Sequence, residues 1–282
     1  METKMKKKKI ATLAASLLVF GALAFTATSC GFLPEDEENK IVDKSGLKLV
    51  WSDEFDSGTT PSTSKWTKEI WNPGKVNNEK QYYTDSEKTA YISDGTLKIK
   101  AYKENGNWYS ARIKTEKKAS WKYGLFEAKI KMPAGNGVWP AFWMMPEDSA
   151  YGTWPRSGEL DIMEYSPSTT KTRAYSTVHH SASESQASTD SYKSLGGKEL
   201  PDAASAWHTY SLRWTEDYVE AFIDGASIGS KYYNDGKGWV NWPYDKPYYI
   251  ILNLAMGGTL GGAIDSSLTE AVFEIDYVRV YQ

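Results

Sequence analysis

Cysteine, histidine and net positive charge are all scarce in this chain. A single cysteine, Cys30, leaves no partner for an intrachain disulfide, so the hydrophobic core alone must hold the fold. Only three histidines occur among 282 residues, and the zinc-protease motif His-Glu-x-x-His is absent, which argues against a catalytic zinc site. A net charge of -3 provides no basic face for phosphate groups, so we expect no nucleic-acid partner.

Aromatic residues, by contrast, are abundant. Twelve Trp and nineteen Tyr stand against eight Phe, which favours rings that carry a polar edge and can stack on partly hydrated ligands. Sugar rings are such ligands. Trp and Tyr also favour strands, so we expect most of these rings to be ordinary core and strand residues.

The amino terminus has the pattern of an export signal. Lys4 and Lys6 to Lys9 precede an apolar run over 10–25, which is shorter than the roughly 20 residues that a membrane-spanning helix needs. Cys30 then follows Ala27, Thr28 and Ser29, and this resembles the lipobox of bacterial lipoproteins, although that motif prefers leucine where Ala27 stands. The sequence predicts a signal peptide over 1–29 and a lipid on Cys30, which places the protein at the bacterial cell envelope or surface; plain secretion is the alternative.

Two further segments follow the signal. Residues 30–45 include Glu35, Asp36, Glu37 and Glu38 and are too polar to form a core, so we expect an acidic tether. From residue 46 to 282 short alternating segments replace this composition. They indicate strands over 47–51, 96–101, 125–132, 159–165, 210–214, 219–223, 248–254 and 273–281.

Turn signals separate these segments, and no long helical pattern competes with them. Asp94-Gly95, Asn105-Gly106 and Asp224-Gly225 are typical of tight hairpins between antiparallel strands. The sequence therefore predicts one all-β domain over 46–282, a β-sandwich of two antiparallel sheets such as a jelly roll.

One strand carries a cluster of acids. Across 159–165 acidic and apolar residues alternate, so Glu159 and Asp161 face one side of the strand, but Glu164 falls out of phase with them. An extra residue at Ile162 or Met163, forming a β-bulge, would return Glu164 to the acidic face. Glu159 and Glu164 could then work as the carboxyl pair of a retaining glycosidase, while a solvated acidic strand face is the alternative reading.

At this point the chain resembles glycoside hydrolase family 16, in its laminarinase-like branch of endo-β-glucanases. The signature E-x-D-x-x-E of that family corresponds to Glu159, Asp161 and Glu164. Further matches run in order along the chain: 51–55 (WSDEF), 78–84 (NEKQYYT), 110–112 (SAR), 123–127 (YGLFE), 137–143 (GVWPAFW) and 276–281 (DYVRVY).

The resemblance implies a jelly-roll sandwich with a concave substrate cleft and hydrolysis of internal β-1,3 bonds in laminarin-type or mixed-linkage β-glucan. It implies retention of configuration, with Glu159 as nucleophile, Glu164 as acid and base, and Asp161 assisting the nucleophile. It also implies that catalysis requires no cofactor. A galactan-cleaving (agarase-like) hydrolase of the same fold and a non-catalytic carbohydrate-binding module are the alternatives, and we expect a monomer.

The same resemblance implies further site residues. The substrate-binding set is Asn78, Arg112, Trp139, Trp143, Trp154 and His179. Taken alone, Trp139 and Trp143 could equally be core residues of an alternating strand, and His179 an ordinary strand residue. A structural calcium ion, as often found in the family, would be held by Glu54, the carbonyl of Gly95 and Asp276.

A protease is the remaining rival class. The segment 56–59 (DSGT) matches the short motif of aspartic proteases, but those enzymes need two such aspartates and no second copy occurs. The serine-hydrolase motif Gly-x-Ser-x-Gly is also absent. We therefore expect 56–59 to be a turn.

Overall fold

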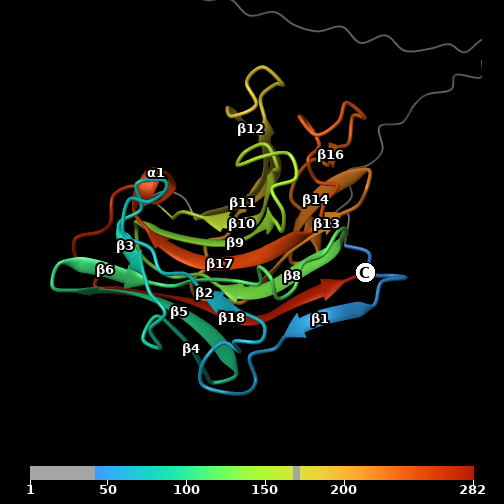
Figure 1. The fold of residues 1–282 in the computed structure, drawn as a ribbon. Helices are drawn as coiled ribbons and strands as arrows, with labels where there is room; N and C mark the ends of the chain where they lie inside the picture. The colour runs from blue at the N-terminus through green and yellow to red at the C-terminus, as the bar shows by residue number, and fades with distance from the viewer. Residues whose placement is uncertain (1–41, 168–171) are drawn as a thin grey trace, which may run out of the picture. The chain divides into compact units, whose positions relative to one another are not determined.

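The computed structural model describes residues 42–167 and 172–282, and these residues form two stacked sheets (Figure 1). One sheet has eleven strands, in the order β15-β14-β13-β8-β18-β5-β6-β3, with β1 on β18, β16 on β14 and β4 on β5. Its strands are β1 (Leu49–Asp53), β3 (Gln81–Tyr83), β4 (Ala90–Ser93), β5 (Thr96–Glu104), β6 (Asn107–Ser110), β8 (Gly124–Lys131), β13 (His208–Trp214), β14 (Tyr218–Ile223), β15 (Ala226–Ser227), β16 (Tyr232–Tyr233) and β18 (Glu270–Tyr281).

The second sheet has seven strands, in the order β12-β11-β10-β9-β17-β7-β2. Its strands are β2 (Thr67–Lys68), β7 (Arg112–Lys114), β9 (Val138–Pro146), β10 (Glu159–Tyr165), β11 (Arg173–Ser181), β12 (Asp190–Glu199) and β17 (Tyr248–Met256), and the short helix α1 (Gly258–Gly261) follows β17. In Figure 1 this sheet lies over the larger one, with β9 and β17 near its middle.

The predicted all-β sandwich is confirmed, with one difference in strand direction. Every strand pair is antiparallel except β3 and β6, which run parallel. The three hairpin turns predicted from Asp-Gly and Asn-Gly have positive φ at both residues, for example 52° and 70° at Asp94 and Gly95 between β4 and β5. No helix within the described ranges is long and apolar enough to cross a membrane.

The core lies between the two sheets. Strand β9 shows how its residues divide: Val138, Phe142 and Met144 are fully buried, whereas Trp139 and Trp143 are only half-buried on the opposite face. Since successive side chains of a strand point to opposite sides, the second face of β9 is free to line a site.

Truncation of a core side chain of β9 should be costly. Phe142 has no exposed surface, so Phe142→Ala should lower the free energy of unfolding by about 3–5 kcal/mol. Denaturant unfolding measures this loss. Ile70→Ala is the control, because Ile70 is 70% exposed and its truncation should change stability by less than about 0.5 kcal/mol. Equal effects of the two substitutions would contradict this description of the core.

The amino-terminal edge of the domain begins slightly before the expected boundary at residue 46. The backbone N–H of Val42 donates to the carbonyl of Gly225 at 2.6 Å, and Lys44 pairs with Glu127 at 2.7 Å. The last residues of the expected tether thus already contact the sandwich. The predicted signal peptide, the lipidation site Cys30 and the rest of the tether lie outside the described residues.

Candidate active site

A β-bulge in β10 brings three carboxyl groups to one face. Toward β9, Asp161 pairs with Trp143 and Met163 with Phe142, so Ile162 has no partner of its own. Toward β11, the register also shifts between Asp161 and Glu164. The predicted bulge is confirmed, and Glu159, Asp161 and Glu164 all line the same cleft.

This cleft lies over the middle of the seven-stranded sheet and has a volume of about 620 Å³. Strands β7, β9, β10, β11, β12 and β17 each contribute side chains to it. Its lining comprises Trp71, Val76, Asn77, Glu79, Arg112, Trp139, Ala141, Trp143, Met145, Trp154, Glu159, Asp161, Glu164, His179, Asp190, Asn253, Thr259 and Leu260.

An indole N–H holds each of the two glutamates. Trp154 Nε1 donates to Glu159 Oε2 at 2.7 Å, and Trp139 Nε1 donates to Glu164 Oε1 at 3.0 Å. A hydrogen bond to a carboxylate stabilises its charged form and fixes its direction. Trp154 is 47% exposed, so one surface of its ring remains open to a ligand beside Glu159.

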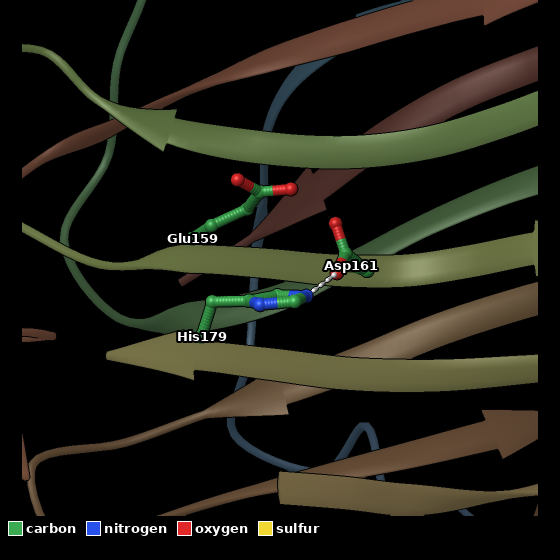
Figure 2. Close-up of side chains that lie close together, drawn as sticks. All are labelled: Glu159, Asp161 and His179. Carbon is green, nitrogen blue, oxygen red and sulfur yellow. Dashed lines mark ion pairs between the residues drawn. The ribbon is translucent and has the colours of Figure 1, made fainter. Parts of the chain in front are cut away.

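Figure 2 shows the imidazole of His179 lying next to Asp161, with Glu159 on the same side. His179 Nε2 is 3.2 Å from Asp161 Oδ2, and Nδ1 is 3.0 Å from both carboxylate oxygens of Asp190. Both ring nitrogens therefore face an acid. His179 pairs in register with Glu159 across the β10–β11 ladder, which explains how it reaches the acidic face.

The local charges keep protons in this cluster at neutral pH. Burial and the charge of Asp161 raise the pKa of Glu159 to about 8, while burial and the charge of Glu164 raise the pKa of Asp161 to about 6. Because the ionisation of each of these two carboxyls depends on the other, we assign the retained proton to the Glu159–Asp161 pair and not to either residue alone.

The pKa values of Glu164 and His179 are raised by different causes. Burial raises the pKa of Glu164 to about 7, against the lowering effect of the Trp139 hydrogen bond. For His179, burial lowers the pKa, but the hydrogen bond to Asp161 and the charges of the surrounding acids outweigh it and raise the pKa to about 10. The site thus combines a carboxyl group that can donate a proton with an imidazole whose positive charge is favoured at neutral pH.

The same cluster could be mistaken for a metal site, because ligand atoms of Glu159, Asp161 and His179 lie within 4.8 Å of one another. A metal ion needs a free lone pair on the imidazole. Here one ring nitrogen faces Asp161 and the other faces Asp190, and the ring is protonated at neutral pH. The geometry favours an ion-pair network over a metal centre.

The far end of the cleft contains a stack of rings around a guanidinium. The Arg112 guanidinium lies 4.3 Å from the ring centre of Trp71 and 4.6 Å from that of Trp143. Arg112 also pairs with Glu69, and Trp143 Nε1 donates to Asn253 Oδ1 at 2.6 Å. Of the proposed substrate-binding residues, Arg112, Trp139, Trp143, Trp154 and His179 therefore come together in the cleft.

Asn78 is placed differently from the other members of that set. It is exposed and is not part of the cleft lining, whereas its neighbour Asn77 is. Both residues have positive φ, 51° and 55°, so the chain turns sharply here and adjacent side chains diverge. In this structure Asn77, and not Asn78, occupies the expected position in the cleft lining.

Several polar lining residues had no assigned role in the sequence, among them Glu79, Asn253 and Asp190. Glu79 lies inside the motif that includes Asn78 and accepts a hydrogen bond from Gln81 Nε2 at 2.7 Å; burial raises its pKa. Asn253 lies on β17, and the continuous apolar pattern of this segment predicted a buried strand without indicating a site residue. Asp190 begins β12 and has no local motif, so only the pairing of β11 with β12 reveals it.

The residues of the proposed calcium site have other partners. Glu54 makes a two-pronged ion pair with Arg279, at 2.8 and 3.1 Å, and Asp276 pairs with Lys129 at 2.7 Å. Gly95 lies in the β4–β5 turn. Since cationic side chains already compensate both carboxylates, the arrangement offers no uncompensated donor set, and the calcium site stays a prediction.

Comparison with known proteins agrees with this geometry. The model of "Glycosyl hydrolases family 16" matches residues 53–279. A beta-glucanase of Rhodothermus marinus is 36% identical over 275 residues, which span 90% of both chains. The X-ray structure of the laminarinase from Rhodothermus marinus superposes with a TM-score of 0.76 at 36% identity, covering 84% of this chain and 97% of that one. SCLam, described as a non-specific endo-beta-1,3(4)-glucanase, has a TM-score of 0.76 at 34% identity over 86% of this chain and 94% of its own.

Two observations lead to the same conclusion. A bulged strand presents three carboxyls in an indole-lined cleft, and the family model matches nearly the whole sandwich. This chain belongs to family 16 of the glycosyl hydrolases.

Proposed function

We propose that this protein is a retaining endo-β-glucanase that hydrolyses internal β-1,3 bonds of laminarin-type or mixed-linkage β-glucan. The observation that carries the proposal is the face formed by Glu159, Asp161 and Glu164 inside a cleft lined by indole rings, two of which donate to the glutamates. The similarity to a laminarinase and to an endo-beta-1,3(4)-glucanase supports the substrate class.

In the first step, the carboxylate of Glu159 attacks the anomeric carbon of the sugar, and Glu164 transfers its proton to the departing glycosidic oxygen. The C–O bond to the leaving chain breaks as the glycosyl–Glu159 ester forms. In the second step, Glu164 takes a proton from water, whose oxygen attacks the same carbon and releases Glu159. Two inversions give net retention.

The surrounding residues stabilise the charges of these steps. The Trp154 N–H and the positive charge of His179 favour the anionic form of Glu159, which must be ionised to attack. Burial raises the pKa of both glutamates. The proton retained by the Glu159–Asp161 pair must lie on Asp161 when Glu159 attacks, whereas Glu164, with a pKa of about 7, keeps a proton that it can donate near neutral pH.

The substrate class can be tested by product release from laminarin, barley mixed-linkage glucan and agarose, with Glu159→Gln as the control. We expect new reducing ends from laminarin with the wild type and none with the variant. Release from agarose alone would replace the proposal with a galactan-cleaving activity. Binding of laminarin by both proteins without release from any of the three would indicate a carbohydrate-binding module.

The hydrogen bond from Trp139 to Glu164 predicts a shift in pH dependence. It stabilises the carboxylate, so Trp139→Phe should raise the pKa of Glu164 by about 1 unit and move the alkaline limb of kcat/KM upward. A pH profile on laminarin measures this shift. Trp143→Phe is the matched control, because its N–H is bound to Asn253, and its alkaline limb should stay in place. A downward shift for Trp139→Phe would contradict the role of the bond.

We also propose that the protein is exported, anchored at the bacterial cell envelope through a lipid on Cys30, and monomeric. The basic and apolar segments before Cys30 support export and anchoring. Detergent phase partitioning of the full chain and of Cys30→Ala tests the anchor: the wild type should enter the detergent phase and the variant the aqueous phase. Equal partitioning of both would favour plain secretion.

A further inference from the structure

The strongest unassigned feature is Asp190, which no catalytic step above uses. It comes from β12, two residues before Tyr192, the partner of His179 in the β11–β12 ladder, and its side chain reaches back to the imidazole. Both Asp190 oxygens lie 3.0 Å from His179 Nδ1. On the other side of the ring, His179 Nε2 meets Asp161 at 3.2 Å.

The three side chains form an unbroken line from the surface to the catalytic carboxyls. The exposed fraction of the side chain falls from 27% at Asp190 to 20% at His179 and 4% at Asp161. In Figure 2 the imidazole lies between its own strand and Asp161, with the ring edge directed at the carboxylate. A carboxylate accepts a hydrogen bond only from a protonated ring nitrogen. Asp190 therefore requires a proton on Nδ1 and orients the ring so that Nε2 faces the site.

The remaining neighbours of His179 do not supply this function. Its ring contacts Trp154, with centroids 6.1 Å apart, and Tyr192, with centroids 6.0 Å apart, and neither offers a negative charge. Tyr244 donates to the backbone carbonyl of His179 and leaves the ring untouched. The charged groups facing the ring are Asp161 and Glu159 on β10 and Asp190 on β12.

We propose that Asp190 is a positioning residue that holds the His179 imidazole with Nε2 against Asp161 and, together with Asp161 and Glu159, favours a positively charged ring beside the catalytic carboxyls. The charge makes it easier for Glu159 and Asp161 to ionise, and Glu159 must be ionised to attack. The consequence for catalysis rests on the proposed function, whereas the position and charge of the ring do not.

The charge of the ring can be measured without any substrate. With only three histidines in the chain, His179 can be assigned in NMR spectra of protein labelled with 15N-histidine. In the wild type the ring should stay protonated through pH 8. In Asp190→Asn, whose amide oxygen can still accept from Nδ1–H but carries no charge, the titration midpoint should fall by about 1–3 pH units. An unchanged midpoint in the variant, or a wild-type midpoint near 6.5, would overturn the proposal.

The chain contains a matched control pair on its other sheet. His208 Nδ1 lies 2.8 Å from Asp224 Oδ2, at the start of β13 and away from the cleft. Asp224→Asn should therefore leave the His179 midpoint and the pH profile of catalysis unchanged. A shift of His179 in this variant would mean that the titration reports general destabilisation.

Kinetics then separate positioning from a purely structural role. The ratio of wild-type to Asp190→Asn kcat/KM on laminarin should be near 1 at pH 5, where the ring is protonated in both. It should rise once the pH passes the lowered midpoint, mostly through kcat, and reach about 10 at pH 8 when the midpoint falls by about 3 pH units. Asp190→Ala, which also frees the ring, should lose about 10- to 100-fold at every pH. A loss of the same size at all pH values for Asp190→Asn would contradict the charge role. If the wild type cleaves no glucan, the proposed function fails, and the NMR titration alone decides on Asp190.

Discussion

Replacement of Glu159 by Gln should lower kcat on laminarin by about 10⁴-fold or more, because the amide cannot form the glycosyl ester. Glu159→Gln keeps the shape of the side chain and an oxygen that can accept the Trp154 N–H. KM should therefore change little, and the loss should reside in the chemical step. Reducing-sugar assays at high enzyme concentration measure the residual rate.

Stability provides the control for this variant. A carboxyl whose pKa is raised in the folded protein binds its proton more tightly there than in the unfolded chain, so its ionisation costs stability as pH rises from about 4 to about 8. Gln at position 159 removes that cost. The melting temperature of Glu159→Gln should match the wild type near pH 4 and exceed it at pH 8. An inactive variant that melts lower at both pH values would point to misfolding in place of a lost nucleophile.

Glu164→Ala should separate the two steps of the reaction. Hydrolysis of laminarin should fall by about 10²- to 10⁴-fold, because the leaving chain receives no proton. An aryl β-glycoside with an acidic phenol needs no such proton, so the ester with Glu159 should still form and then accumulate. Azide requires no general base and should restore turnover, giving a β-glycosyl azide whose anomer proton NMR identifies.

The matched variant is Glu159→Ala, in which azide takes the place of the nucleophile itself. It should attack the substrate directly and give the α-glycosyl azide. The opposite assignment of roles would exchange the two products. Azide rescue of neither variant, with both correctly folded, would contradict the two-glutamate mechanism.

The sequence was most informative where local pattern and tertiary environment agree. Strand β10 has the bounds expected from the alternation of acidic and apolar residues, and the break in that alternation at Glu164 located the bulge. The burial of Leu160 in the core and the position of Glu159 and Asp161 on the cleft face follow from the same period of two.

Other parts of the site depend on contacts between distant segments. Strand β12 is an edge strand with mostly exposed or half-exposed residues, so it lacks the apolar alternation that would have predicted it or Asp190. Trp71 and Arg112 are 41 positions apart and meet only because β2 and β7 pair at the edge of the sheet. The turn at Asn77 and Asn78 was equally hidden, since two adjacent asparagines give no sign of which one faces the cleft.

The stereochemistry of the first product tests the central claim most directly. Proton NMR of laminarin during rapid hydrolysis distinguishes the two anomers of each new reducing end before they interconvert. A β anomer that appears first, with the α anomer following only by mutarotation, is the predicted result of double displacement by Glu159 and Glu164. An α anomer that appears first, or no new reducing end at all, would contradict it.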